Sequence, residues 1–325
     1  MPIIYRNTGQ HSLRHIKGIR VNRREWMTCT LALLSAACAD HTADVSPEED
    51  EAAGKPLGER FSVFVPTPER AALRMLELAR VGPNDLVLDL GSGDGRIALL
   101  AATRFGARGW GVDIDAARVD QSNAEAERRG LAGRVRFEHG DATLINPREA
   151  SVVTLYLFPA LINRLVPILL KHLRPGARIV TYEYTLADWP PEETLQTYVP
   201  ERYLGFGGDA PIRLWVVPAN FSGSWSGMID VPVKLPLEIN LNQRYQRING
   251  FVSVGGRKHD ISTTHVRGDE IEFSFDIDRA KYSLSARLVD GQLAGEALLK
   301  RGEKTTLRQW SAIRTGEPSR IDISP

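Results

Sequence analysis

The sequence predicts an α/β fold in residues 59–219 and an antiparallel all-β fold in residues 220–316, with a short tail at 317–325. Three observations support this prediction. An apolar run at 86–90 ends in glycines at every second position and is followed by an amphipathic helix. Strand-like apolar runs then alternate with helical stretches up to residue 217. From Asn220 the apolar residues recur with a period of two, which is typical of half-buried strands.

The composition is that of an ordinary globular protein. Of 325 residues, 42% are hydrophobic and 25% are charged, which is sufficient for two cores. Lys and Arg total 41 against 40 for Asp and Glu, so no global basic field indicates a nucleic-acid partner. Both cysteines, Cys29 and Cys38, lie near the N-terminus, which excludes thiolate sites and disulfides from the remaining chain. The histidines show no ligand spacing, and we assign no metal.

Residues 1–58 are expected to be an export leader and a disordered linker. Two arginines at 23–24 precede an apolar stretch at 28–39 that ends in small residues before Cys38. This resembles a bacterial export signal of the twin-arginine or lipoprotein type, and a lipidated Cys38 would tether the protein to a membrane of the cell envelope or periplasm. The alternative is a short helix of a cytoplasmic protein, because the stretch is too short to cross a bilayer as a stable helix.

The glycine turn at residues 91–95 follows the first strand. Glycine lets backbone N–H groups approach a ligand closely, and the helix N-terminus that follows favours negative charge. The dinucleotide spacing G-x-G-x-x-G would need glycine or alanine at position 96, where this chain has Arg96. The turn therefore indicates a nucleotide-like cofactor with another glycine spacing, and a turn needed only for tight strand–helix packing is the alternative.

Two acids close the next two predicted strands. Asp113 lies near the end of the strand expected at 110–115, where a carboxylate can accept both ribose hydroxyls of an adenosine. Asp141 ends the strand at 135–142, after a charged helix at 116–129. Two spaced acids after a G-x-G-x-G turn form a specific constellation.

These motifs resemble those of the class I, seven-strand S-adenosylmethionine-dependent methyltransferases. The resemblance covers residues 61–218 and implies a Rossmann-like sheet with helices on both faces and S-adenosyl-L-methionine as the cofactor. In that family the acid that closes the third strand, here Asp141, faces the adenine amino group. The cofactor-binding residues that the resemblance implies within the strand ends and the glycine turn are Asp89, Gly91, Gly93, Asp94, Gly95, Asp113, Asp141 and Ala142.

The segment 65–67 before the first helix adds to this resemblance. Together with D-L-G-S-G-D-G-R at 89–96, it is similar to bacterial relatives of the mitochondrial ATP synthase c-subunit lysine methyltransferases. It is also similar to the non-SET histone lysine methyltransferases, in which a threonine at this place touches the cofactor. The resemblance thus implies that Thr67 binds the cofactor, while local sequence favours Thr67 as the N-cap of a helix with Pro68 at its first position.

The fourth strand, at 151–159, ends where a substrate would meet the methyl group. Its last residues resemble the apolar motif of the lysine-modifying relatives and differ from the acidic or amide residue with two prolines in enzymes that act on DNA or glutamine. We expect Tyr156, Phe158 and Pro159 to line a channel for a desolvated amine, with a role in the core as the alternative. Glu183 and Tyr184, at the end of the fifth strand, and Asp188 after it are further candidates for substrate contacts, with solvated surface acids as the alternative. Strands near 195–199 and 212–217 would complete the seven.

Between residues 223 and 314, turn signals separate about eight short strands, which predicts a small antiparallel barrel or sandwich. Trp225 near its start, with Trp310 and Arg314 near its end, weakly resembles the closing pair of lipocalin-like barrels, in which arginine stacks on tryptophan. A domain of this size can be filled by its own side chains. No catalytic grouping is evident within it.

The sequence therefore predicts a methyltransferase that transfers a methyl group in line from S-adenosylmethionine to a protein lysine. The choice of lysine rests on family similarity alone. Two alternatives stay open: a non-enzymatic exported binding protein that keeps the fold, and a methyltransferase acting on a small molecule or lipid.

Overall fold

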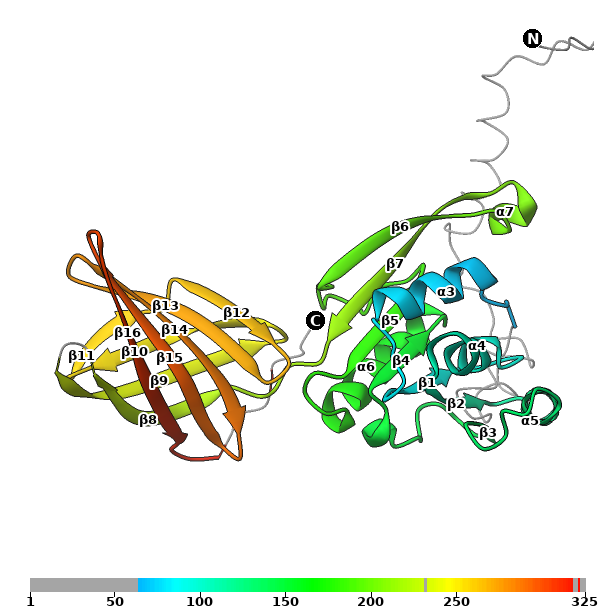
Figure 1. Ribbon diagram of the computed structural model, residues 1–325, viewed down its shortest axis with the longest axis horizontal. Coiled ribbons are helices and arrows are strands. Elements are labelled where there is room, and N and C mark those ends of the chain that lie inside the picture. Colours follow the sequence, from blue (N-terminus) through cyan, green and yellow to red (C-terminus); the bar gives the residue numbers. More distant parts are fainter. Residues whose placement is uncertain (1–63, 231–232, 318–320, 322–325) are drawn as a thin grey trace, which may run out of the picture. The chain divides into compact units, whose positions relative to one another are not determined.

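The computed structural model describes residues 64–230, 233–317 and 321 of the chain (Figure 1). The expected leader and linker, both cysteines and most of the expected tail lie outside these residues, as does the predicted lipidation site. Within the described residues, no helix is long and apolar enough to cross a membrane.

A seven-stranded sheet forms the first part of the structure, with strand order β3-β2-β1-β4-β5-β7-β6. The first five strands pair in parallel, and β7 runs antiparallel to both of its neighbours, β5 and β6. The α/β prediction is confirmed. The strands are β1 (Leu86–Leu90), β2 (Arg108–Asp113), β3 (Val135–His139), β4 (Val152–Leu155), β5 (Arg178–Tyr182), β6 (Glu193–Val199) and β7 (Gly208–Val216).

Helices cover both faces of this sheet, because its central strands are apolar on both sides. Val87 of β1 belongs to the core formed with the first helix, whereas Leu88 belongs to the core formed with the helix after β4. The predicted N-cap is wrong: this first helix begins at Glu69, and Pro68, with φ −54° and ψ 139°, occupies the capping position, so Thr67 lies one residue too early. The helices are α3 (Glu69–Leu78), α4 (Arg96–Phe105), α5 (Ala116–Arg128), the 3-10 turn η2 (Pro147–Glu149), α6 (Pro159–His172) and α7 (Arg202–Gly205).

The second part is one antiparallel sheet of nine strands, with order β11-β10-β9-β8-β16-β15-β14-β13-β12. Strand pairing ends at β11 and β12, so it does not close the sheet into a barrel. The inner face is packed with aromatic and aliphatic side chains such as Phe221, Trp225 and Phe275. The strands are β8 (Gly223–Asp230), β9 (Lys234–Arg244), β10 (Arg247–Val254), β11 (Arg257–Asp260), β12 (Thr263–Arg267), β13 (Glu270–Ile277), β14 (Ala280–Val289), β15 (Gln292–Arg301) and β16 (Lys304–Arg314).

Arg314 joins the two ends of this β domain. Its guanidinium carbon lies 4.1 Å from the centroid of the Trp225 ring, and its Nη1 and Nη2 donate hydrogen bonds to the carbonyl oxygens of Ser222 and Asn220. The expected stacking of an arginine on a tryptophan is thus present, between Arg314 and Trp225.

Replacing Arg314 by alanine is expected to lower the free energy of unfolding of the β domain by about 2 kcal/mol, since the cation–π contact and two hydrogen bonds disappear. Urea denaturation followed by tryptophan fluorescence would measure this loss. Arg308→Ala, at an exposed position of the same strand, serves as the control. Equal urea midpoints of unfolding for the two variants would mean that Arg314 does not stabilise the β domain by joining its two ends.

Candidate active site

The predicted acids gather at the edge where the parallel strands end. Asp89 lies in β1, Asp113 is the last residue of β2, and Asp141 follows β3. In an open α/β sheet, ligands bind in the crevice outside the carboxyl ends of the strands. The structure therefore brings these three side chains to the edge at which a cofactor is expected.

The glycine turn has a backbone that only glycine adopts easily. Gly91, Gly93 and Gly95 have φ values of +76°, +54° and +75°. A Cβ at Gly95 would lie 2.5 Å from the ring of Phe137, so this glycine also permits the turn to pack on β3. A Cβ at Gly93 would lie 2.1 Å from the ring of Phe64, in the segment before α3. Conformation and packing thus both require glycine here, and the turn also borders the hollows described below.

Asp113 is buried, and backbone donors fix its carboxylate. Its Oδ2 accepts a hydrogen bond of 2.7 Å from the N–H of Gly93, and its Oδ1 accepts one of 2.9 Å from the N–H of Asp115. A carboxylate has about four acceptor sites, so further donors can bind the same group. Asp113 is therefore oriented in advance by the glycine turn.

Asp141 is held by the turn that follows β3. Its Oδ1 accepts hydrogen bonds of 2.8 Å from both the backbone N–H and the hydroxyl of Thr143. The neighbouring Ala142 lines the same hollow as Asp141 and Asp113. The third predicted strand end thus contributes both of its expected residues to the site.

Asp89 is a buried acid with other acids nearby. Burial raises its pKa to about 7, a hydrogen bond of 2.6 Å from the hydroxyl of Thr154 opposes this rise, and the charges of Asp113 and Asp94 add to it. A carboxyl group in such surroundings gains most from a cationic ligand, which would favour its ionised form.

Arg96 joins the glycine turn to the segment before α3. Its Nε donates to both carboxylate oxygens of Asp94, at 2.9 and 3.0 Å, and its Nη1 donates to the carbonyl oxygen of Thr67 at 2.9 Å. Burial acts to raise the pKa of Asp94, but the hydrogen bonds and the charge of Arg96 lower it overall. This contact between Arg96 and Thr67 could not be predicted from the sequence, because it joins two segments that only the tertiary structure brings together.

Two adjoining hollows at this edge contain most of the predicted cofactor residues. The larger one is lined by Asp113, Asp141 and Ala142, and the smaller one by Thr67, Asp89 and Asp94. The residues that line both hollows are Phe64, Val65, Gly91 and Tyr156.

The free volumes of the two hollows are about 80 and 20 Å³, below the 300–1,000 Å³ of typical ligand pockets. The ring of Phe64, under the guanidinium of Arg118 at 3.9 Å, occupies the space above the turn. A nucleotide-sized ligand would therefore have to displace Phe64.

Among the predicted channel residues, only Tyr156 reaches these hollows. Its ring centroid lies 4.8 Å from that of Tyr182 and 6.2 Å from that of Tyr184, on which it stacks at 18°. Phe158 and Pro159 lie at the start of α6 and line neither hollow. Tyr182, the last residue of β5, was missed because its place beside Tyr156 follows from the pairing of β4 with β5.

Glu183, beside this tyrosine cluster, has a left-handed backbone with φ +68°, which is uncommon for a residue other than glycine. Arg202 Nη2 donates to its carboxylate at 2.7 Å, and Arg213 Nη1 donates to its carbonyl oxygen at 2.7 Å. Two arginines thus hold this residue next to the tyrosines.

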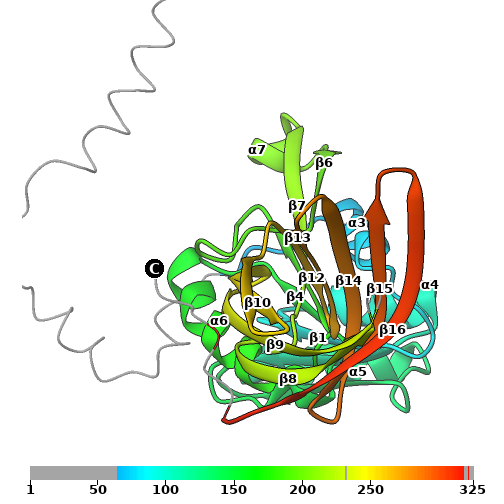
Figure 2. The same ribbon diagram turned by 90° about the vertical axis from the view of Figure 1, so that its left-hand side faces the viewer.

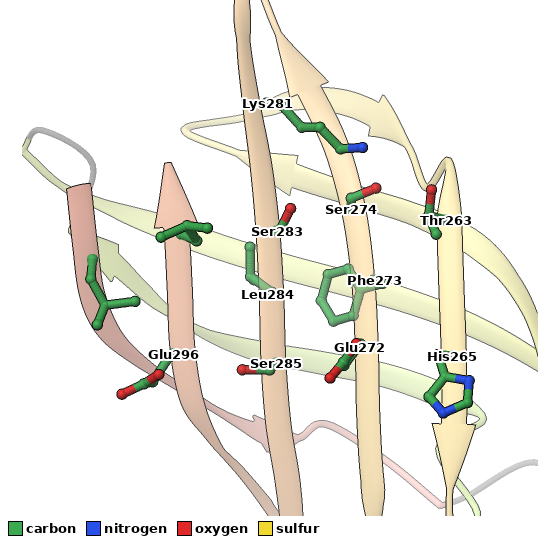
Figure 3. A pocket seen from close by; sticks show the side chains of 12 residues that line it. Thr263, His265, Glu272, Phe273, Ser274, Lys281, Ser283, Leu284, Ser285 and Glu296 are labelled. Atoms are coloured by element: carbon green, nitrogen blue, oxygen red, sulfur yellow. The ribbon is translucent and has the colours of Figure 1, made fainter. Parts of the chain in front are cut away.

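Another hollow, of about 470 Å³, lies on the outer face of the β domain (Figure 3). Small side chains such as Ser274 and Ser283 form its floor, between Lys281 on one side and Glu272 and Glu296 on the other. None of the predicted cofactor residues lines it, so the candidate site is the edge of the seven-stranded sheet.

Comparisons with known proteins find methyltransferases. A family model described as the ANTKMT methyltransferase domain matches residues 89–193. A protein-lysine N-methyltransferase of Saccharolobus islandicus (strain REY15A) is 40% identical over 134 residues, which cover 41% of this chain and 83% of that protein. The adenine nucleotide translocase lysine N-methyltransferase of Mus musculus is 29% identical over 172 residues, which cover 53% and 69% of the two chains. A solved RNA methyltransferase from Salinibacter ruber, in complex with S-adenosyl-L-homocysteine, is 39% identical over 47% of this chain and 94% of that one, with a TM-score of 0.43.

The similarity to the S. islandicus protein extends over most of that protein's length, and the match of the family model begins at Asp89 and includes the glycine turn, Asp113 and Asp141. Buried acids and left-handed glycines lie together at the sheet edge. The acids can accept hydrogen bonds from an adenosine and can attract cationic groups, so these residues fit a cofactor that carries both. The chain therefore belongs to the class I S-adenosylmethionine-dependent methyltransferases, and it is an enzyme that uses S-adenosyl-L-methionine.

Proposed function

We propose that this enzyme methylates the side-chain nitrogen of a lysine in a protein substrate. The observation that carries the proposal is the aromatic wall at the end of β4, where Tyr156 lines both hollows and contacts two further tyrosines. A slender apolar amine fits such a wall better than a planar base that needs hydrogen-bonding groups. The names of the relatives from S. islandicus and M. musculus, both lysine N-methyltransferases, support the same choice.

The proposed cofactor site follows the division into two hollows. Asp113 would bind the ribose hydroxyls, and Asp141 and Ala142 the adenine, in the larger hollow. Thr67, Asp89 and Asp94 would bind the methionine part in the smaller one. The glycines 91, 93 and 95 would bring the backbone close to the cofactor between these parts, as their left-handed conformation supports.

In the proposed mechanism, the chain positions the reactants and excludes water. When bound, the cofactor would supply a methyl group on a sulfonium, which the neutral lysine nitrogen would take over as the carbon–sulfur bond breaks and S-adenosyl-L-homocysteine leaves. The lysine must first lose its proton to solvent. Burial raises the pKa of Tyr156 and of Tyr182, and the same desolvation would lower the pKa of an amine placed beside them.

The proposal is tested by incubating the protein with a cell extract and S-adenosylmethionine that carries a tritiated methyl group. After acid hydrolysis, the label is expected in methylated lysine. Label in RNA, in lipid, or in an amino acid other than lysine would contradict the proposal.

Tyr156→Ala is expected to lower kcat by about 100-fold with little change in cofactor affinity, because small errors in positioning have effects of this size. Tyr156→Phe, which keeps the ring, is expected to retain kcat within about threefold. Single-turnover kinetics with the labelled substrate would measure both variants. Equal losses in the two variants would mean that the hydroxyl, and not the aromatic wall, is required.

Arg96→Ala is expected to weaken binding of S-adenosylmethionine by about tenfold, since the four hydrogen bonds that the Arg96 side chain donates to Asp94 and Thr67 are lost. Arg104→Ala, on the exposed surface of the same helix, provides the control. Calorimetric titration would compare the two dissociation constants. Unchanged binding by a folded Arg96→Ala protein would exclude a positioning role for this arginine.

A further inference from the structure

The hairpin turn between β9 and β10 has an unusual residue in its first position. The two strands lie side by side in the nine-stranded sheet (Figures 1 and 2) and pair up to Arg244 and Arg247, so their loop consists of Tyr245 and Gln246. Tyr245 has a left-handed backbone with φ +52°, where such loops favour glycine, asparagine or aspartate. A bulky residue is an outlier in this conformation, which indicates that its side chain has another role.

Both loop residues contact the α/β domain, with which the β domain forms one compact unit. The Tyr245 ring is buried and lies parallel to the Trp189 ring, with the centroids 5.3 Å apart and an angle of 4° between the planes. The Tyr245 hydroxyl donates a hydrogen bond of 3.0 Å to Oδ1 of Asp188, and Trp189 Nε1 donates one to Oε1 of Gln246. Arg244 adds an ion pair with Asp188. The turn therefore holds two consecutive residues, 188 and 189.

The buried side chain of Gln243 supports the turn from within the β domain. Its Nε2 donates hydrogen bonds of 2.7 Å to the carbonyl oxygen of Tyr245 and of 3.0 Å to that of Ala219. Its Oε1 accepts one of 2.7 Å from the N–H of Phe221. These bonds attach the turn to the segment between β7 and β8, so the Tyr245 ring is presented from a fixed position.

The residues that the turn holds belong to the loop at 183–192, between β5 and β6. Glu183 and Ala187 in this loop have left-handed backbones, with φ +68° and +45°, although neither is glycine. Such backbones persist only where the surrounding contacts impose them. Near the start of the loop, Tyr184 stacks on Tyr156, which lines both hollows. The loop thus connects the turn of the β domain with the aromatic wall of the proposed active site.

The connection between the turn and the wall is densely packed. Leu186 and Trp189 are buried and belong with Tyr245 to one core cluster, against which Tyr184 packs. Close-packed interiors transmit displacements from one side chain to the next. Loss of the Tyr245 ring would therefore let Trp189 and the loop shift, and Tyr184 would shift with them.

We propose that Tyr245 is a positioning residue: through the loop at 183–192 and Tyr184, it holds the aromatic wall at the place where the methyl acceptor binds. The β domain then takes part in the reaction, although none of its described residues lines either of the two hollows. This inference rests on the proposed function, since the wall at Tyr156 is the proposed acceptor site. The alternative is a turn that joins the two domains and has no effect on methyl transfer.

The test uses Tyr245→Gly in the full-length protein. This substitution removes the ring and suits the left-handed backbone, so the turn itself should still form. The initial rate of transfer of a tritiated methyl group from S-adenosylmethionine to the proteins of a cell extract is expected to fall by about tenfold, because small errors in positioning have effects of this size. The affinity for S-adenosyl-L-homocysteine, measured by calorimetric titration, is expected to stay within about twofold, since the cofactor site is not altered.

Hydrogen–deuterium exchange provides a second readout that needs no substrate. The N–H groups of Tyr184 and Trp189 donate hydrogen bonds to the carbonyl oxygens of Tyr182 and Leu186, so their exchange reports on the loop. In Tyr245→Gly, both N–H groups are expected to exchange about tenfold faster, because the loop opens more often when its support is lost.

Two variants serve as controls. Tyr245→Phe keeps the ring and loses only the hydrogen bond to Asp188, so it is expected to retain the rate within about twofold. Asp290→Gly makes the same kind of change at an exposed left-handed position, with φ +48°, in the hairpin between β14 and β15. It should leave both the rate and the exchange of the loop unchanged.

Several results would overturn the inference. One is an unchanged rate in Tyr245→Gly, and another is an equal loss of rate in Tyr245→Phe. A loss of cofactor affinity as large as the loss of rate would place the effect in the cofactor site. Unchanged exchange at Tyr184 would exclude the proposed connection by itself. The amino acid that carries the label tests the proposed function separately: label outside lysine contradicts that function, while the ratio of the rates still decides the role of Tyr245.

Discussion

Asparagine in place of Asp113 is expected to weaken the binding of S-adenosylmethionine by about 100-fold, because hydrogen bonds to a buried carboxylate are among the strongest in proteins. The N–H groups of Gly93 and Asp115 already orient the carboxylate, so its remaining lone pairs can accept hydrogen bonds from a ligand without a movement of the side chain. An asparagine amide would turn an NH₂ group toward one of these donors. Calorimetric titration of the full-length protein would measure the loss of affinity.

Asp120→Asn, an exposed substitution on α5, is the control for a change of one charge near the site. Because Asp113 also supports the glycine turn, urea denaturation must show that Asp113→Asn is folded. Asp141→Asn offers a second variant whose hydrogen bonds stay within its own turn. Undiminished binding by folded Asp113→Asn and Asp141→Asn proteins would contradict the proposed adenosine site.

Asp89 is expected to make the stability of the protein depend strongly on pH. Its carboxyl group ionises near pH 4 in the unfolded chain, whereas burial raises its pKa to about 7 in the folded protein. Between these pH values the folded state binds the additional proton, so the contribution of Asp89 to the free energy of unfolding falls as the pH rises. The total loss is on the order of 4 kcal/mol above pH 7.

Asp89→Asn cannot ionise and should therefore lack this loss. Its stability relative to the unsubstituted protein is expected to increase from pH 4 to pH 7 and to stay constant above that, as measured by urea denaturation at each pH. The same variant should bind S-adenosylmethionine more weakly, because the ionised carboxylate is the form that suits a cationic ligand. A stability difference that does not change with pH would contradict the raised pKa of Asp89.

Much of the α/β domain could be predicted because its signals are local. The apolar strands are buried on both faces, and the glycine turn needs its left-handed backbone wherever the rest of the chain lies. Asp113 and Asp141 follow directly from the ends of their strands. The order of the seven strands and the parallel pairing of the first five agree with the family resemblance.

The features that could not be predicted depend on contacts between distant parts of the chain. The ring of Phe64 above Gly93, the contact of Arg96 with Thr67, and the place of Tyr182 beside Tyr156 all join different elements. The predicted cap of α3 was misplaced by one residue because Pro68 has a ψ of 139° instead of a helical value, so the helix begins only at Glu69.

The β domain shows the same division. Alternation along strands such as β13 predicted which side chains face the core, and Ile271, Phe273 and Phe275 are indeed buried. Closure of the sheet into a barrel depends on whether its two edge strands pair with each other, which the alternation of apolar and polar residues does not specify. The strand pairing leaves β11 and β12 as the two edges.

A crystal structure of the protein with S-adenosyl-L-homocysteine tests the central claim most directly. We predict the adenosine beside Asp113 and Asp141, the homocysteine beside Thr67 and Asp89, and the ring of Phe64 displaced from the glycine turn. The sulfur would then face Tyr156. A ligand bound elsewhere, or the same pocket with the sulfur directed away from Tyr156, would contradict the proposed site and the route of the methyl group.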